Sequence, residues 1–118
     1  SVAEALLDRI NLPQSTDHLR ALALVSREDS ELANAVYEAG PGRSLDRLAA
    51  WLQIQNQRGV LDIDDAEQAA EIFIGMVQGH AYLRLVLNMP PLAGRDLNAH
   101  AREAAHRFVM AYARPSGL

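Results

Sequence analysis

A histidine and an arginine, His80 and Arg84, stand four residues apart in the second half of the chain. If this segment is an α-helix, the spacing places both side chains on one face, and the rest of that face is apolar. A guanidinium beside an imidazole can bind an anionic or hydrogen-bonding ligand. Alternatively, Arg84 reaches solvent or pairs within the chain and His80 bonds a carbonyl, because an unpartnered buried arginine is costly.

A second candidate for ligand contact is the segment 45–58, where Trp51 and Gln55 share a helix face with three leucines. The tryptophan offers a large apolar surface and one N–H donor. A buried amide needs hydrogen-bond partners, which a ligand, a water molecule or a neighbouring chain can supply. Ordinary core filling explains Trp51 equally well.

Three apolar residues, Phe73, Met76 and Val77, complete the predicted ligand-binding set. They lie on the same helix face as His80, and a flexible methionine suits an adaptable pocket wall. A stripe of this kind also forms simple hydrophobic core. Tyr37 and Met89 are lesser candidates.

Neither metal binding nor catalysis is predicted, and no cofactor is expected. His100 and His106 are six residues apart, which points them in different directions on a helix, and no cysteine or HExxH pattern accompanies them. No nucleophile motif or glycine-rich phosphate loop occurs. The carboxylates of "DIDD" stand at a helix start, where capping explains them.

Composition favours one cytoplasmic globular domain over residues 1–118. The chain is 49% hydrophobic and has no cysteine, which removes disulfides and thiolate metal sites together. The net charge of −4 and the scattered arginines argue against direct binding of a nucleic-acid backbone by this chain. No apolar run is long enough to span a membrane, and the start does not have the pattern of a signal peptide.

The elements that must position these residues are all predicted to be helices, about five to six in number. Alanine and leucine dominate, and no alternating strand pattern occurs. Glycine and proline punctuation gives helices within 1–10, 18–28, 30–39, 45–58, 65–88 and 96–113, and the alternative for 18–39 is a single kinked helix. Asp64 and Glu67 have the spacing of a capping box at the start of the long helix.

Two glycines four residues apart, Gly75 and Gly79, raise a separate question, because each costs roughly 1 kcal/mol inside a helix. Their side of the helix carries apolar residues where an exposed helix would carry charge. We expect a close approach of another helix there, either within the protomer or across a dimer interface. The last helix has a similar second face. The predicted dimer-interface residues are Ile72, Gly75, Gly79, Tyr82, Leu83, Val86, Ala99, His106, Met110 and Ala113.

The order of these elements resembles the C-terminal domain of TetR/AcrR-type bacterial transcriptional regulators, of the AefR-like type. The residues that carry the resemblance are "YEAGPGR", a helix ending in Q-x-x-G, the connector "VLDIDD" and "A-x-x-A-A-x-x-F-x-G-M-V-x-G". The resemblance covers roughly residues 19–113. It implies an all-helical regulatory domain whose last two helices form a homodimeric four-helix bundle, with a small-molecule effector bound between the other helices.

Such regulators carry an N-terminal helix-turn-helix that reads DNA, and none is recognisable here. We therefore expect a fragment of a longer regulator, with DNA binding belonging to the missing domain and no membrane association. The expected partners are a second copy of the chain and a small hydrophobic or anionic inducer. The alternatives are a stand-alone helical module that binds a different protein and, less favoured, a small-molecule carrier or enzyme bundle.

Overall fold

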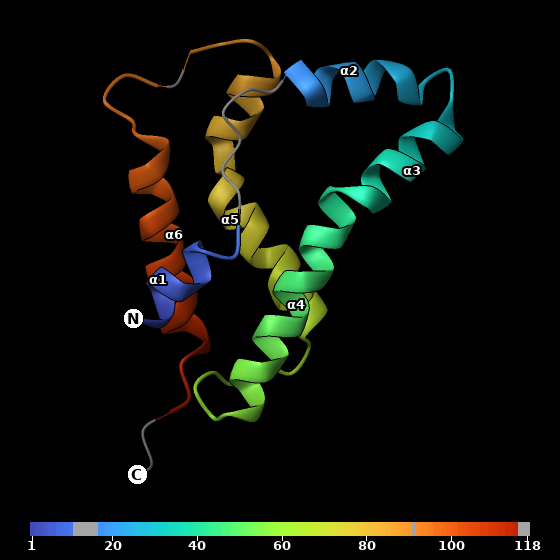
Figure 1. Ribbon diagram of the computed structural model, residues 1–118. Helices are drawn as coiled ribbons and strands as arrows, with labels where there is room; N and C mark the ends of the chain where they lie inside the picture. The colour runs from blue at the N-terminus through green and yellow to red at the C-terminus, as the bar shows by residue number, and fades with distance from the viewer. Residues whose placement is uncertain (11–16, 91, 116–118) are drawn as a thin grey trace.

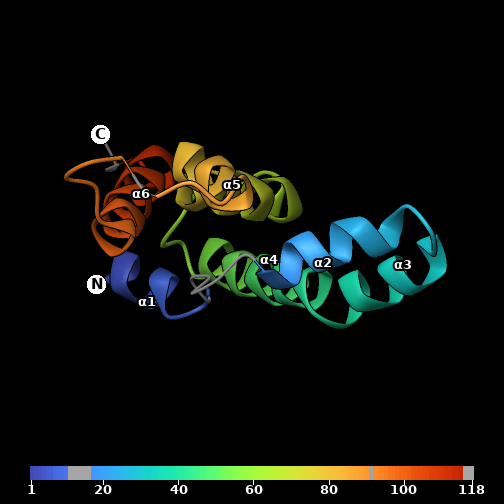
Figure 2. The same cartoon turned by 90° about the horizontal axis from the view of Figure 1, so that it is seen from above.

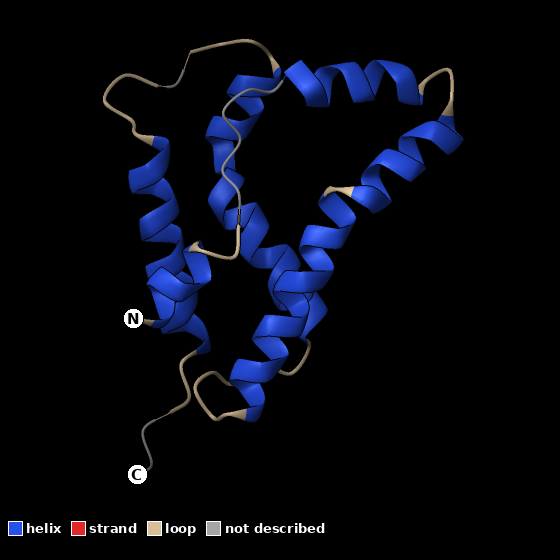
Figure 3. Ribbon diagram, in the orientation of Figure 1, coloured by secondary structure: helices blue, strands red, loops and turns tan. Residues whose placement is uncertain are grey.

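The structure, a computed structural model, describes residues 1–10, 17–90 and 92–115, with the backbone alone for residues 17–20 and 22. These residues form six α-helices joined by loops (Figures 1 and 3), which confirms the predicted all-α fold. The helices are α1 (Val2–Leu7), α2 (Asp17–Ser26), α3 (Ser30–Ala39), α4 (Pro41–Gln57), α5 (Ala66–Val86) and α6 (Leu97–Tyr112).

Aspartates cap three of the helices, as their short acceptor side chains favour. Asp29 accepts from the Leu32 N–H at 2.9 Å and separates α3 from α2, so residues 18–39 are two helices. Asp65 accepts from the Gln68 N–H at 3.1 Å at the start of α5. The prediction that Asp64 would cap this helix was one residue too early.

The start of α4 also differs from the prediction, which treated Gly40 to Arg43 as a linker. Gly40 is the N-cap and Pro41 occupies the first turn of the helix, where its missing N–H leaves no hydrogen bond unmade. Gly42 lies against the Tyr37 ring, and a Cβ there would come within 3.0 Å of Tyr37 Cε1. The close approach of the Tyr37 ring at the junction of α3 and α4 therefore depends on Gly42.

The helices form two layers, which Figure 2 shows edge-on. In one layer α5 and α6 run antiparallel as a helical hairpin. In the other layer α4 packs against α5, and α1 packs against α6. Helices α2 and α3 extend beyond the layers, and α2 returns to contact α5 (Figure 1).

The hydrophobic core lies between the two layers. Its centre is Phe73 of α5, whose ring meets the Phe108 ring edge-on at a centroid distance of 5.1 Å, and Phe108 in turn packs on Tyr112 at 4.6 Å. Alanines around these rings let the helices approach closely. The buried apolar residues are Leu6, Leu48, Ala49, Leu52, Leu61, Ile63, Ala69, Ala70, Phe73, Val77, Ala101, Ala104, Ala105 and Phe108.

The connector between α4 and α5 closes the lower end of the core in Figure 1. The Asp62 N–H donates to the Tyr112 carbonyl at 2.8 Å, and the Asn56 side chain accepts from the Ile63 N–H at 2.9 Å. Arg114 Nε donates to the Gly59 carbonyl at 3.2 Å. These bonds fix Leu61 and Ile63 as buried residues beneath the end of α6.

The protomer is thin for its size. It measures 55 × 37 × 18 Å, and the short dimension fits two helix layers spaced about 10 Å apart but not a third. Its radius of gyration is 16.0 Å, whereas a compact domain of this length is expected near 13 to 14 Å. The helices of each layer therefore have one face that the protomer itself does not cover.

We predict that Phe108→Ala lowers the free energy of unfolding by about 3–5 kcal/mol, because it removes the ring that joins Phe73 to Tyr112. Urea denaturation at fixed protein concentration measures this. The matched control is Ile54→Ala on α4, where the side chain is 48% exposed and the expected change is within about 0.5 kcal/mol. Equal effects of the two substitutions would contradict the position of the core.

Candidate functional site

The long helix α5 is interrupted at Gly79, which has φ 53° and ψ −159°. Residues with a side chain rarely adopt this conformation, so glycine is required at this position. The prediction of an unbroken helix over 65–88 is therefore wrong at this residue. The break divides α5 into a first segment, 66–78, and a second segment, 80–86, whose faces are not related by helical periodicity.

A histidine from α6 occupies the break. His100 Nε2 lies 2.7 Å from the Met76 carbonyl, and because a carbonyl only accepts, Nε2 carries the donated proton. A Cβ built on Gly79 would lie 3.0 Å from this nitrogen, whereas one built on Gly75 would meet nothing within 4 Å. Close packing within the protomer thus explains Gly79, whereas no contact within the protomer explains Gly75.

Most of the predicted dimer-interface residues are exposed in the protomer. Ile72 is 42% exposed and Met110 is 57% exposed, although both are large and apolar. Gly75, Gly79, Leu83, Ala99, His106 and Ala113 are also exposed, and Tyr82 and Val86 are half-buried. We call these ten residues the outer face; their role in dimerisation stays a prediction.

Tyr82, on the second segment of α5, is half-buried. Partial burial disfavours the charged phenolate and raises the pKa of the Tyr82 hydroxyl above its ordinary value. The side chain therefore stays neutral at physiological pH, where it can donate a hydrogen bond and present an apolar ring to the outer face.

His80 and Arg84 are on neither the core face nor the same surface as Phe73, contrary to the prediction. His80 is exposed and Arg84 is half-buried, because the break at Gly79 turns the second segment away from the core. Arg84 Nε donates to the Pro90 carbonyl at 2.9 Å, which ties the segment to the loop that follows it. This bond matches the alternative in which Arg84 pairs within its own chain.

Both residues line a cleft of about 220 Å³ between the second segment of α5 and the start of α6. We call it the α5–α6 cleft, and its lining residues are His80, Ala81, Arg84, Leu92, Arg95, Asp96, Leu97 and His100. Arg95, Leu92 and His100 were not predicted as lining residues. The sequence does contain a signal for this cleft, because basic residues stand on both sides of the loop that joins two predicted helices: Arg84 before it, and Arg95 and His100 at its end and after it.

The other predicted ligand-binding residues lie in or beside the core rather than in this cleft. Phe73 and Val77 are buried, and Met76 and Trp51 are partly buried against them. The Arg9 guanidinium stacks 5.4 Å from the centre of the Trp51 ring. The structure therefore divides the predicted set into an interior group and the pair His80 and Arg84.

Gln55 is 8% exposed and is the only buried polar residue among those described. Its main-chain carbonyl accepts from the N–H groups of Val60 and Leu61, at 3.0 and 3.4 Å, and so ends α4. No buried side-chain nitrogen or oxygen of the described residues lacks a hydrogen-bond partner. Gln55 thus provides no unpaired buried polar group that would require a ligand.

The two lesser candidates lie elsewhere. Tyr37 packs against Gly42, and Met89 is exposed.

In the part of the chain that the structure describes, no cluster of three or more histidine and acidic side chains is arranged to hold a metal ion. No helix of the described residues has both the length and the apolar character needed to cross a bilayer.

Residues 1–114 match the family described as AefR-like transcriptional repressor, C-terminal domain. A search of curated proteins and a search of solved structures each found no match.

We predict that Gly79→Ala lowers the free energy of unfolding by about 1–3 kcal/mol, because alanine is strained at this φ and ψ and its methyl group meets His100. Gly75→Ala is the control: this position is helical and unobstructed, so within a protomer alanine stabilises by up to about 1 kcal/mol. Chemical denaturation of both variants at one protein concentration gives the comparison. Equal stabilisation by the two alanines would show that α5 is continuous.

Proposed function

The chain belongs to the family of AefR-like transcriptional repressor C-terminal domains, and from this premise we propose that it is the dimerisation and effector-sensing part of a TetR-type regulator. Two copies associate through the outer face, and a small molecule bound within the domain changes their arrangement. DNA is contacted by a helix-turn-helix domain in the longer protein. The regulator acts in the cytoplasm.

The observation that carries this proposal is the apolar outer face of the α5–α6 hairpin. Ile72 and Met110 are exposed on the same two helices that bury Phe73 and Phe108 in the core. A helix packed against a single core normally presents charge to solvent on its far side. Small residues elsewhere on the outer face, such as Gly75 and Ala99, permit a close helix-helix approach.

The exposed area of the protomer supports association. A folded monomer of 12.9 kDa is expected to expose about 6,300 Å², whereas this protomer exposes 8237 Å². The excess exceeds the roughly 800 Å² that each partner buries in a standard interface. A second copy fits best, because twofold symmetry lets an antiparallel helical hairpin meet its own equivalent as a four-helix bundle.

Effector sensing requires a ligand that prefers one arrangement of the dimer. A ligand shifts an equilibrium between two states only through its different affinity for them. The helices that line a ligand site must therefore also move the outer face. Helix α5 meets this condition, because its residues form part of the core, part of the α5–α6 cleft and part of the outer face.

The test uses substitutions that place a charge or a bulky group on the outer face. We predict that Ile72→Glu weakens dimerisation at least tenfold, because burying an unpaired carboxylate costs several kcal/mol. Gly75→Leu should do the same by steric exclusion, and it avoids the strain that any substitution at Gly79 introduces. Sedimentation equilibrium over a range of concentrations measures the dissociation constants.

The matched control is Ile54→Glu, since Ile54 is exposed to a similar extent, 48% against 42%, but lies on α4 in the opposite layer. We expect it to leave the dimer unchanged. If Ile54→Glu dissociates the dimer and Ile72→Glu does not, the interface lies on the other layer. A chain that is monomeric without any substitution would favour the alternative, a module that binds a different protein.

A further inference from the structure

We propose that the α5–α6 cleft binds a small carboxylate that has an apolar body. The inference rests on the proposed function, because it gives the effector a chemical class and a place. The cleft lies at the upper end of the α5–α6 hairpin in Figure 1, away from the core beneath α4. Its lining combines basic side chains with apolar ones.

The basic side chains lack counter-ions. Arg95 has no side-chain hydrogen bond or ion pair among the described residues, where the only ion pairs join Ser1 to Glu4 and Glu103 to Arg107. Arg84 uses Nε to bond the Pro90 carbonyl, which leaves its two terminal nitrogens available. Two guanidinium groups therefore line the cleft without a carboxylate bound to either.

One acidic side chain, Asp96, also lines the cleft, and its carboxylate is already engaged as the N-cap of α6. Its carboxylate accepts from the Asn98 N–H at 3.0 Å and caps the start of α6. A carboxylate at this position is stabilised by the N–H groups of the first helical turn. The two arginines outnumber it, and His80 and His100 add two further hydrogen-bonding rings.

The remaining lining residues are apolar and limit the size of the ligand. Ala81, Leu92 and Leu97 give the cleft its hydrophobic wall. A volume of about 220 Å³ corresponds to roughly seven water molecules at about 30 Å³ each. This is below the usual range of pockets for drug-sized ligands. A single planar carboxylate, which a guanidinium can bind through two parallel hydrogen bonds, on a small ring or short chain suits these dimensions.

The cleft also bridges the break in α5. His80, Ala81 and Arg84 belong to the second segment of that helix, whereas Arg95 lies just before α6 and His100 lies in its first turn. His100 at the same time holds the Met76 carbonyl of the first segment. A carboxylate bound by Arg84 and Arg95 would thus fix the second segment, with Tyr82 and Leu83 of the outer face, against α6.

The experiment is isothermal titration of the 118-residue chain with benzoate, benzamide and inorganic phosphate. We expect benzoate to bind with an affinity that falls as salt is added, because the attraction is between charges and is partly screened. Benzamide, which has the same shape without the charge, and phosphate, which has the charge without the apolar body, should each bind at least about tenfold more weakly.

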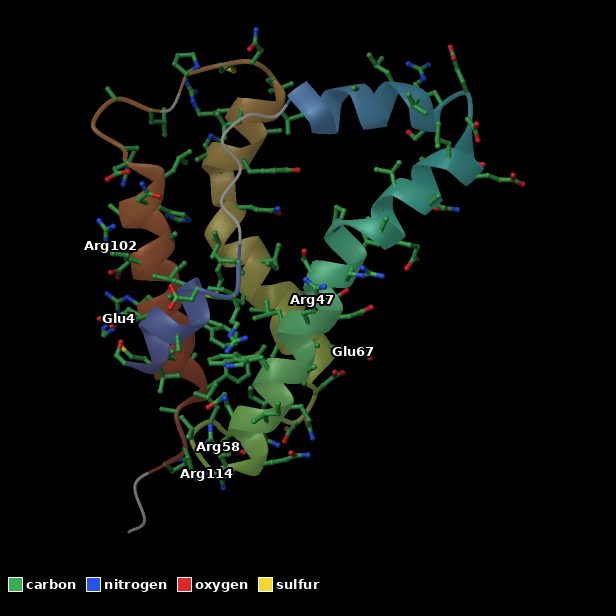
Figure 4. All side chains as sticks on the ribbon, in the orientation of Figure 1. Glu4, Arg47, Arg58, Glu67, Arg102 and Arg114 are labelled. Carbon is green, nitrogen blue, oxygen red and sulfur yellow. The ribbon has the colours of Figure 1, made fainter. Side chains whose placement is uncertain are left out.

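The variant that tests the site is Arg95→Gln, because this side chain makes no contact that the fold needs. It should weaken benzoate binding about tenfold or more, the usual effect of losing a hydrogen bond to a charged group. The control is Arg47→Gln, which makes the same change of charge on α4, away from the cleft (Figure 4). It should leave the affinity unchanged.

Equal binding of benzoate and benzamide, equal binding of benzoate and phosphate, no benzoate binding, or equal effects of the two glutamine variants would each overturn the inference. Light scattering on the same samples separates this result from the proposed function. A dimer that does not bind benzoate would refute the carboxylate site alone. A monomer whose benzoate binding depends on Arg95 would refute the dimer alone.

Discussion

The packing of two helix layers against one thin core is the constraint on which the rest of this molecule depends. Phe73 and Phe108 fill the space between the layers, and the small residues beside them, such as Ala70 and Ala105, bring the helices close together. A protomer 18 Å thick can cover only the inner side of α5 and α6. The apolar residues on their outer side are therefore either covered by a second chain or left exposed to water. The hydrophobic effect disfavours exposure.

The two glycines of α5 have different physical causes, although the sequence presents them as one pattern. Gly79 is required by a backbone conformation that a side chain would strain, and by the approach of His100. Gly75 is helical and has free space beside it. The break redirects the end of α5, so the helix contributes one segment to the core and another to the α5–α6 cleft. A helix divided in this way can link the occupancy of a cleft to the position of an interface.

Much of the fold could be predicted from the sequence, because its helices obey local rules. Alanine-rich amphipathic periodicity, aspartate caps and the stop at Gly59 place the helix boundaries within a few residues, except at the start of α4, and Phe73 was identifiable on an apolar stripe. The site was less predictable. A helical wheel assumes an unbroken helix, so it placed His80 and Arg84 beside Phe73. Arg95 and Leu92 lie near a loop, where no periodicity reports which side chains meet. The break also involves a tertiary contact with His100, which no local sequence pattern reports.

Small-angle X-ray scattering of the unaltered chain tests the central claim most directly, because it reports mass and shape together. If the outer face is covered by a second copy, the forward scattering at micromolar concentration corresponds to twice 12.9 kDa. Dilution should then return the protomer only at the dissociation constant of the dimer. A mass of 12.9 kDa with a radius of gyration near 16.0 Å at every concentration would contradict the account.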